Sequence, residues 1–318
     1  MTEPITTGAV LDAPASQPRG RPIRRRRRFK ALTAWGYIMP ALALFIVFMF
    51  WPLVYTVIMT FFKGNTSDPM QRFVGLKNYM ITLKSPDTLR LLWQTGIYIV
   101  ILVVVIFVIP YVLAFVNQFV LVKRKKFYKI IIFMPSLISL VVGAMLLQWL
   151  FNPIIGPASK IVQLFGGTMP TWSKTPGLVI LVISLVACYK AFGYNFLVLL
   201  AGVGTVSNEL IEVARLEKAP NHTIFAKIMM PLTAPTAIYV LIMSIVQGVQ
   251  YVFTPIKVLT QGGPSGASSN LLYGTYQNAF LYFDPGTASV LSVITMAIFI
   301  ILLVLEFRFV ERGVYYEN

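Results

Sequence analysis

The sequence has very few of the side chains that hold metals or form disulfides. Of 318 residues, one is cysteine, Cys188, and one is histidine, His222. A single cysteine forms no intrachain disulfide and no CxxC pair, and a single histidine forms no His-rich metal centre. We therefore expect no metal site in this chain, and the disulfide-stapled and zinc-dependent protein classes are excluded.

Nucleotide-binding and hydrolase motifs are missing too. The sequence contains no GxxxxGK[ST] phosphate loop, no HExxH and no GxSxG, and no Asp or Glu lies in the middle of a long apolar run. The first absence argues against nucleotide hydrolysis by that route. The last argues against a carrier driven by protons or sodium ions, which usually needs acidic or unwound sites at mid-membrane. If the chain moves a solute, we expect the energy to come from a partner.

Hydrophobic side chains are abundant, at 57% of the residues, whereas charged residues make up 12%. These shares are typical of a polytopic membrane protein, and a hydrocarbon core of about 30 Å needs about 20 residues of helix. The sequence therefore predicts an all-α fold with six transmembrane helices, at about residues 35–62, 91–119, 127–151, 176–203, 232–253 and 287–305. Prolines interrupt three of these runs, as membrane helices tolerate.

Positive charge is unevenly divided among the connections between these runs. Eighteen Lys and Arg residues lie in the N-terminal segment, the connections near 123–129 and 204–231, and the C-terminal tail, whereas the opposite connections hold eight. By the positive-inside rule, both termini are predicted to be cytoplasmic. No basic face is interleaved with aromatic residues on a soluble domain, so we expect no nucleic-acid partner. Residues 1–30 are predicted to be a basic, largely disordered cytoplasmic tail, and residues 31–318 the membrane domain.

The predicted cytoplasmic connection at about 204–231 is too long for a simple turn between spans. Ser207 is a plausible N-cap for a helix at about 208–217, and Pro220 forbids its continuation. A second helix from about Asn221 to Pro231 would place Ile224, Phe225 and Ile228 on one face. The result is a helix-turn-helix. It is either an amphipathic connector resting on the membrane or the bundle, or a docking helix for a cytosolic partner.

Residues of this connection resemble the EAA loop in the membrane subunits of binding-protein-dependent ABC importers. The usual pattern is EAA, three residues, G, nine residues, I, one residue, LP. Its positions correspond in order to Glu212, Val213, Ala214, Lys218, Ile228, Met230 and Pro231. Val213, Lys218 and Met230 depart from it. The Lys218 departure matters most, because Gly adopts a left-handed turn at little cost whereas another residue there costs on the order of 1 kcal/mol.

Two further segments are similar to the carbohydrate branch of that family, of the maltose and glycerol-phosphate type. They are FVGLKNY at 73–79 and LTQGGPSGASSNLLYGTYQNAF at 259–280. The resemblance implies a permease that forms half of a translocation path by alternating access in a bacterial or archaeal cell (inner) membrane. It implies these partners: a second related permease, two ATPase subunits that carry ATP and Mg, an extracellular or periplasmic solute-binding protein, and a carbohydrate.

The resemblance also implies that this loop couples the permease to the ATPase. Glu212 would engage the ATPase, while Ala214 and Ala219 would allow close helix packing. The coupling residues would be Glu212, Val213, Ala214, Glu217, Lys218, Ala219 and Pro231. No catalytic residue is expected in this chain, because ATP hydrolysis would occur on the partner.

Polar side chains inside two apolar runs are candidates for the substrate path. They are Tyr189, Lys190, Tyr194 and Asn195 in the fourth run, and Gln247, Gln250 and Tyr251 in the fifth. Aromatic rings and amides commonly bind sugars, but the same residues could be interhelical hydrogen bonds that hold the bundle. Lys190 could instead indicate an acidic or phosphorylated solute. The Gly- and Ser-rich segment 261–269 is predicted to be an extracellular loop, either near an outer gate or simply flexible.

Two other functions remain open from the sequence. One is a membrane scaffold that recruits a cytosolic partner other than an ATPase, and the other is a self-sufficient facilitator or channel.

Overall fold

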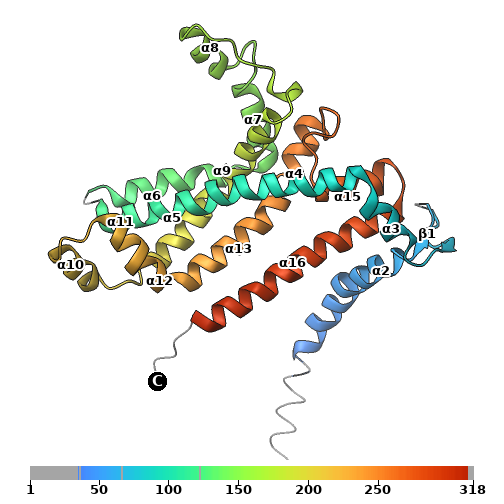
Figure 1. The fold of residues 1–318 in the computed structure, drawn as a ribbon, viewed down its shortest axis with the longest axis horizontal. Coiled ribbons are helices and arrows are strands. Elements are labelled where there is room, and N and C mark those ends of the chain that lie inside the picture. The colour runs from blue at the N-terminus through green and yellow to red at the C-terminus, as the bar shows by residue number, and fades with distance from the viewer. Residues whose placement is uncertain (1–34, 36, 66, 122, 314–318) are drawn as a thin grey trace, which may run out of the picture. The chain divides into compact units, whose positions relative to one another are not determined.

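The structure is a computed structural model that describes residues 35, 37–65, 67–121 and 123–313. The predicted N-terminal tail lies outside these residues. Two compact units separate between Tyr55 and Thr56. The part of the chain that the structure describes is almost entirely helical (Figure 1), which confirms the predicted all-α fold.

Five helices are long and apolar enough to cross a membrane, and a sixth span results if one sharply bent helix pair is counted as a span. The six predicted spans are therefore confirmed, with the third span broken. The helices are Tyr37–Met59, Pro86–Val120, Leu178–Val203, Ala234–Thr260 and Pro285–Leu305, and the bent pair is Lys125–Leu137 with Leu140–Leu150.

The first span combines a π turn, η1 (Ile46–Phe50), with α2 (Trp51–Met59). Every described side chain from Trp35 to Tyr55 is exposed. Apolar surface of this extent is unstable in water, so this helix requires lipid or another chain around it.

A short hairpin follows the first span. Strands β1 (Phe62–Lys63) and β2 (Arg72–Phe73) pair antiparallel, and helix α3 (Lys77–Lys84) comes next. The Asn78 side chain donates hydrogen bonds to the backbone oxygens of Thr60, at 2.9 Å, and Phe62, at 2.7 Å. This amide therefore ties α3 to the end of the first span, which gives the asparagine of FVGLKNY a structural role.

The second span is one continuous helix of 35 residues, Pro86–Val120. It starts at Ser85, whose hydroxyl accepts a hydrogen bond from the Asp87 amide, with Pro86 in the first turn where its missing N–H costs nothing. Two π turns interrupt the α-helical geometry. Its segments are α4 (Pro86–Val103), η2 (Val104–Val108), α5 (Ile109–Phe115) and η3 (Val116–Val120).

The third span is broken by a 98° bend between Leu137 and Leu140. It consists of α6 (Lys125–Phe133), the 3₁₀ turn η4 (Met134–Leu137) and α7 (Leu140–Leu150). The predicted span at 127–151 therefore holds in position, and the interruption expected at Pro135 takes the form of this bend. Pro135 cannot donate a backbone hydrogen bond, and Ser139 has extended backbone and caps α7 by accepting from the Val142 amide.

Helix α9 (Leu178–Val203) packs along both the second and the third span and forms the centre of the core. One buried cluster surrounds its first half and includes Tyr98, Ile183 and Ile256, and another surrounds its second half and includes Phe115, Phe196 and Val203. Between α7 and α9 lie α8 (Pro157–Leu164) and the short turn η5 (Trp172–Lys174).

Carbonyl groups at the break in the third span receive hydrogen bonds from α9. The Lys190 ammonium donates to the backbone oxygens of Ser136, at 2.7 Å, and Ile138, at 3.2 Å. The Tyr189 hydroxyl donates to the Ser139 oxygen at 2.7 Å. Because a helix break inside a membrane needs partners for its freed backbone groups, these two side chains stabilise the bend.

The rest of the chain forms the 204–231 connection and two more spans. The helical segments of the connection are α10 (Asn208–Leu216), α11 (Asn221–Thr223), η6 (Ile224–Met229) and α12 (Met230–Leu232). The fifth span consists of α13 (Ala234–Gln250), α14 (Phe253–Pro255) and η7 (Ile256–Thr260), and it ends seven residues later than predicted. The last elements are α15 (Leu271–Tyr276), η8 (Gln277–Leu281) and α16 (Pro285–Gly313).

We predict that Lys190→Met lowers the stability of the folded chain, because two carbonyls at the break lose a charged hydrogen-bond donor. Hydrogen bonds to charged groups contribute about 1.5–3 kcal/mol, and partial exposure of Lys190 places the expected loss in the lower part of that range. Thermal unfolding of the purified chain in mild detergent measures the effect. Lys160→Met, at an exposed lysine of α8, is the matched control. Equal unfolding temperatures for the two variants would contradict the capping role.

Candidate functional site

The first arm of the 204–231 connection is α10, one residue shorter than the predicted helix at about 208–217. Ser207 occupies the N-cap position, but its side chain makes no capping hydrogen bond, so that part of the prediction is wrong. Glu209 lies in the first turn, where the helix dipole favours a carboxylate. Ile211 and Ala214 are buried, which fixes the inner face of α10.

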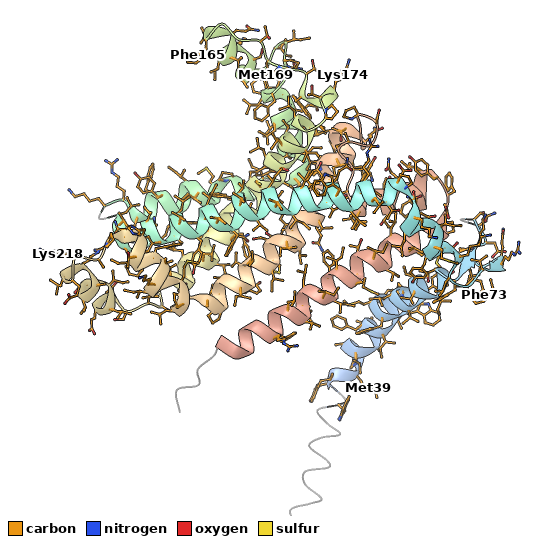
Figure 2. The ribbon with its side chains drawn as sticks, in the orientation of Figure 1. Met39, Phe73, Phe165, Met169, Lys174 and Lys218 are labelled. Atoms are coloured by element: carbon orange, nitrogen blue, oxygen red, sulfur yellow. The ribbon has the colours of Figure 1, made fainter. Side chains whose placement is uncertain are left out.

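Helix α10 ends in a Schellman motif, in which two backbone amides fold back onto the last turn. The Ala219 amide donates to the Ala214 oxygen at 3.0 Å, and the Lys218 amide donates to the Arg215 oxygen at 2.9 Å. Lys218 has φ +58°, the left-handed conformation that usually selects glycine. The loop therefore keeps the left-handed turn for which the EAA pattern has glycine, and in this chain Lys218 adopts it. Figure 2 shows Lys218 beside α10 at this end of the molecule.

The second arm packs firmly on the end of the second span. It begins at Pro220, and Ile224 and Met229 are fully buried. The Phe225 ring contacts the rings of Tyr111, with centroids 5.3 Å apart, and Phe115, at 5.4 Å. Ile224, Phe225 and Ile228, which are predicted to share one face, all lie in or against the same buried cluster.

Two polar contacts fasten the connection to its neighbours. The Arg215 guanidinium donates to the backbone oxygen of Phe119, in the last turn of the second span. At the other end of the connection, the hydroxyls of Tyr111 and Thr233 are 2.5 Å apart. The connection is thus attached to the second span at two places and continues directly into α13.

The outward side of α10 combines apolar and acidic side chains. Val213 is 56% exposed and Leu216 is 81% exposed, with the exposed carboxylates of Glu212 and Glu217 beside them in sequence. Exposed apolar side chains rimmed by charge mark interaction surfaces. Of the other predicted coupling residues, Ala214 faces inward, Ala219 is partly buried, and Lys218 and Pro231 are exposed.

The predicted substrate-path residues divide into two places. Tyr189 and Lys190 lie at the break in the third span. Asn195 and Gln247 come together in the core, where the Asn195 amide donates to Gln247 Oε1 at 3.2 Å, Ser244 Oγ at 3.1 Å and the Ile106 oxygen at 2.9 Å. These contacts join the second, fourth and fifth spans and correspond to the interhelical alternative. Tyr194 and Gln250 are exposed and Tyr251 is partly buried, so a path that these residues line stays a prediction.

The Gly- and Ser-rich segment 261–269 is held by one face of α4 that the sequence analysis did not single out. Arg90 donates to the Ser265 oxygen at 2.7 Å, Gln94 to the Gly266 oxygen at 3.1 Å, and Tyr98 to the Ser268 oxygen at 2.9 Å. Ser268 and Ser269 are buried. Polar residues four apart within an apolar span were the available signal for this contact.

Next to this segment, the Leu271 amide donates to the Thr95 hydroxyl and Asn270 caps α15. The Lys257 ammonium lies over the Tyr276 ring, 4.4 Å from its centre. Burial raises the pKa of the neighbouring Tyr273 phenol. The phenol therefore stays neutral at physiological pH, and the end of the fifth span packs on α15 through aromatic and cation–π contacts.

Comparison with known proteins identifies the family to which this chain belongs. Residues 121–314, which include the 204–231 connection, match the family described as binding-protein-dependent transport system inner membrane component. The chain belongs to this family. It is therefore a multi-pass permease component of a transport system of the inner membrane, and the resemblance seen in the EAA-type residues is confirmed.

Relatives and solved structures of this family match nearly the whole chain. The sn-glycerol-3-phosphate transport system permease protein UgpA of Brucella abortus is 30% identical over 88% of this chain and 95% of its own length. UgpA of Agrobacterium fabrum is 31% identical over 88% and 94%. A bacterial ABC transporter for import of the acidic polysaccharide alginate matches with a TM-score of 0.77 at 17% identity, over 91% of this chain and 99% of its own.

We predict that Lys218→Gly stabilises the turn after α10, because glycine removes a left-handed strain on the order of 1 kcal/mol. The gain is reduced by the larger unfolded-state freedom of glycine. Exchange of the backbone amides at positions 218 and 219 should be roughly two- to fivefold slower in the variant than in the wild type, as measured by hydrogen–deuterium exchange. Glu217→Gly is the matched control. Its φ is −72°, so glycine there should speed exchange. Faster exchange in Lys218→Gly would contradict the proposed strain.

Proposed function

We propose that this chain is the transmembrane permease subunit of an ATP-driven ABC importer for a carbohydrate. It forms half of the translocation path, and a second, related permease forms the other half. Two ATPase subunits bind ATP and Mg²⁺ and drive the cycle from the cytoplasm. A solute-binding protein delivers the sugar from outside. The family membership supports the importer, and the alginate system among the similar structures supports a carbohydrate as its solute.

The observation that carries the proposal is the two-sided character of α10. Its inner face is locked into the buried cluster through Ile211 and Ala214, whereas its outer face presents Glu212, Val213 and Leu216 to a partner. A helix fixed in this way transmits a force from the partner as a rigid-body movement, whereas a mobile connector would absorb it. The ATPase is the proposed partner, because the chain itself has no phosphate loop and needs an external source of energy.

The attachments of the connection indicate where such a movement would go. A displacement of α10 acts on the second span through Arg215 and Phe119, and on the fifth span through the direct continuation at Thr233. These two spans meet again at the Asn195 network in the core. We propose that the network moves as a unit, so that displacement at the membrane surface reorients the spans around the path in alternating access.

The proposed orientation places α10 and both termini in the cytoplasm. Its support is the distribution of Lys and Arg, eighteen on this side against eight on the other. The five basic residues at positions 123–129 and three in the 204–231 connection are assigned to the same side. Arg215 of the connection binds the Phe119 oxygen, four residues before the first of the five.

A second candidate solute is acidic or phosphorylated. The names of the similar transport systems, for glycerol 3-phosphate and for alginate, favour it. Lys190 was the residue that suggested it, and two hydrogen bonds already direct its ammonium group to backbone oxygens of its own chain. We therefore place the neutral carbohydrate first.

We predict that Glu212→Lys abolishes co-purification of the ATPase while the chain stays folded. Glu212 is exposed, so reversing its charge alters the docking face and leaves the internal packing unchanged. Leu216→Asp should weaken the same association, since its 81% exposed side chain contributes contact area but little internal packing. Pull-down of the tagged full chain in mild detergent, followed by mass spectrometry, measures the outcome. Asp68→Lys, an exposed charge reversal far from the connection in sequence, is the control.

Recovery of a second permease and an ATPase with the wild type and with Asp68→Lys, but no ATPase with Glu212→Lys, is the expected result. Absence of any ATPase under every mild condition would refute the importer and favour the scaffold. Solute uptake by the isolated chain in vesicles would select the facilitator.

A further inference from the structure

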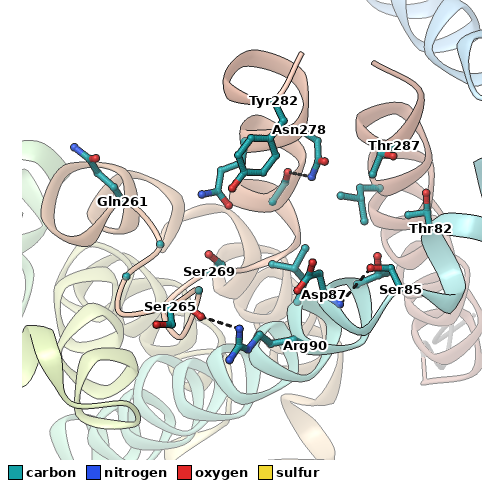
Figure 3. Close-up of a pocket in the computed structure, with 18 of the residues that line it drawn as sticks. Thr82, Ser85, Asp87, Arg90, Gln261, Ser265, Ser269, Asn278, Tyr282 and Thr287 are labelled. Carbon is teal, nitrogen blue, oxygen red and sulfur yellow. Dashed lines mark hydrogen bonds between the residues drawn. The ribbon is translucent and has the colours of Figure 1, made fainter. Parts of the chain in front are cut away.

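A cavity of about 560 Å³ lies at the start of the second span, within the part of the chain that the structure describes (Figure 3). Its walls come from α3, the first turns of α4 and α16, the segment 261–269, and the region from α15 to Tyr282. The volume falls within the range of small-molecule sites, about 300–1,000 Å³.

The cavity lies far from the coupling connection. Asp87 borders the cavity, and Phe119, which binds Arg215, lies 32 residues further along the same helix. At 1.5 Å per residue the two ends are separated by about 48 Å, which exceeds the thickness of the hydrocarbon core. With α10 in the cytoplasm, as proposed above, the cavity opens on the extracellular side.

Uncharged polar groups dominate the lining, together with apolar side chains. Hydroxyls and amides come from Thr82, Ser269, Gln261, Gln277 and Tyr282, and apolar side chains include Ile81 and Leu91. Figure 3 shows Thr82, Ser269 and Tyr282 around the opening. Hydroxyl and amide groups both donate and accept hydrogen bonds, and this pairing matches a ligand whose hydroxyls do the same.

Charge in the cavity is balanced. Asp87 and Arg90 are the two charged residues among its described lining, and they stand one helical turn apart. The Arg90 guanidinium already donates to the Ser265 oxygen at 2.7 Å. With one charge of each sign, the lining favours a neutral ligand over a phosphate or a carboxylate.

One lining group lacks a partner. Thr82 is 2% exposed, and its hydroxyl has no hydrogen-bond partner within the described chain. Leaving a buried hydroxyl unsatisfied is costly, and such groups are rare in folded proteins. Its oxygen has less than 1 Å² of exposed surface, so a ligand hydroxyl in the cavity supplies the missing partner only after the wall around Thr82 moves slightly.

We propose that this cavity binds a neutral, polyhydroxylated solute, such as one or two sugar units, at the extracellular end of the chain. The Thr82 hydroxyl makes the buried contact, and the amide of Gln277 binds at the rim. This site is separate from the predicted path residues in the fourth and fifth spans. It rests on the proposed function for its orientation and its choice of sugar, but it does not depend on the ATPase.

A reporter cysteine tests the site in the full chain. Cys188 is 3% exposed, so a cysteine placed on the surface is the reactive thiol. Ile81→Cys places it on the cavity wall, at a side chain that is 58% exposed and is not one of the proposed polar contacts. Lys160→Cys places a control thiol on α8, outside the cavity. The alkylation rate of each is measured in detergent against increasing maltose, and separately against sn-glycerol 3-phosphate.

We expect maltose to slow alkylation of Ile81→Cys at least threefold and to leave Lys160→Cys unchanged. Thr82→Val keeps the shape and removes the hydroxyl, so it should raise the half-protecting maltose concentration about 3- to 10-fold. Thr275→Val is the matched control, because Thr275 lies in α15 outside this cavity and its hydroxyl bonds the Leu271 oxygen. Gln277→Ala gives a second test of the rim if Thr82→Val unfolds.

Three results would overturn the proposal. They are no protection by maltose, protection that neither Thr82→Val nor Gln277→Ala weakens, and protection by sn-glycerol 3-phosphate alone, which would make the cavity an anion site. Protection by an added solute-binding protein but not by maltose would likewise identify a docking recess for protein. ATPase co-purification is measured on the same samples. Failure of the cavity with the ATPase retained therefore refutes this site and leaves the importer intact.

Discussion

Inside a bilayer no water is available to hydrogen-bond a broken helix, and this constraint governs the centre of the molecule. The third span turns through 98°, and its freed carbonyls at Ser136, Ile138 and Ser139 are served by Lys190 and Tyr189 of α9. A lysine deep in an apolar helix is costly by itself, but here it offsets a second cost. The bend and the lysine each make the other tolerable, and α9 becomes the element on which the neighbouring spans are assembled.

Close backbone approach supports the same arrangement. A Cβ at Gly193 would lie 2.8 Å from the Ile132 oxygen, and one at Gly143 would lie 2.0 Å from the Tyr189 hydroxyl. Small residues at helix crossings allow the packing that drives association in lipid, where no hydrophobic gain is available between helices. The hydrogen bonds of Tyr189 and Lys190 are therefore made possible by glycines on both partners.

Much of this fold follows from patterns that a sequence displays directly. Long apolar runs give the spans, because the hydrocarbon core selects for length and hydrophobicity alone. The two arms of the 204–231 connection follow from Pro220 and from helical spacing. The EAA pattern has glycine where this chain has Lys218, so the sequence leaves open whether the left-handed turn is kept, and the structure keeps it. The spans and the two arms depend on local chemistry, so no knowledge of distant contacts is needed to predict them.

Other features depend on contacts between residues far apart in sequence. Pro135 predicts an interruption but not its direction, which the packing against α9 sets. The partners of Lys190 are backbone oxygens, which no side-chain pattern reveals. The composition of 261–269 is equally compatible with a flexible loop, yet bonds from Arg90, Gln94 and Tyr98 across more than 160 positions fix it. The substrate-path residues remain a prediction for the same reason, since their role depends on the second permease.

The length of the second span has a consequence for the membrane around it. Its 35 residues extend about 52 Å, against a hydrocarbon core of about 30 Å. Even a tilt of 40° would leave part of the helix outside the core, which is where Arg90 at one end and Gln118 at the other can remain hydrated. A helix that is longer than the hydrocarbon core adjusts to a thicker or thinner bilayer by changing its tilt. For this helix, hydrophobic mismatch is therefore a weak constraint on the thickness of the bilayer around it.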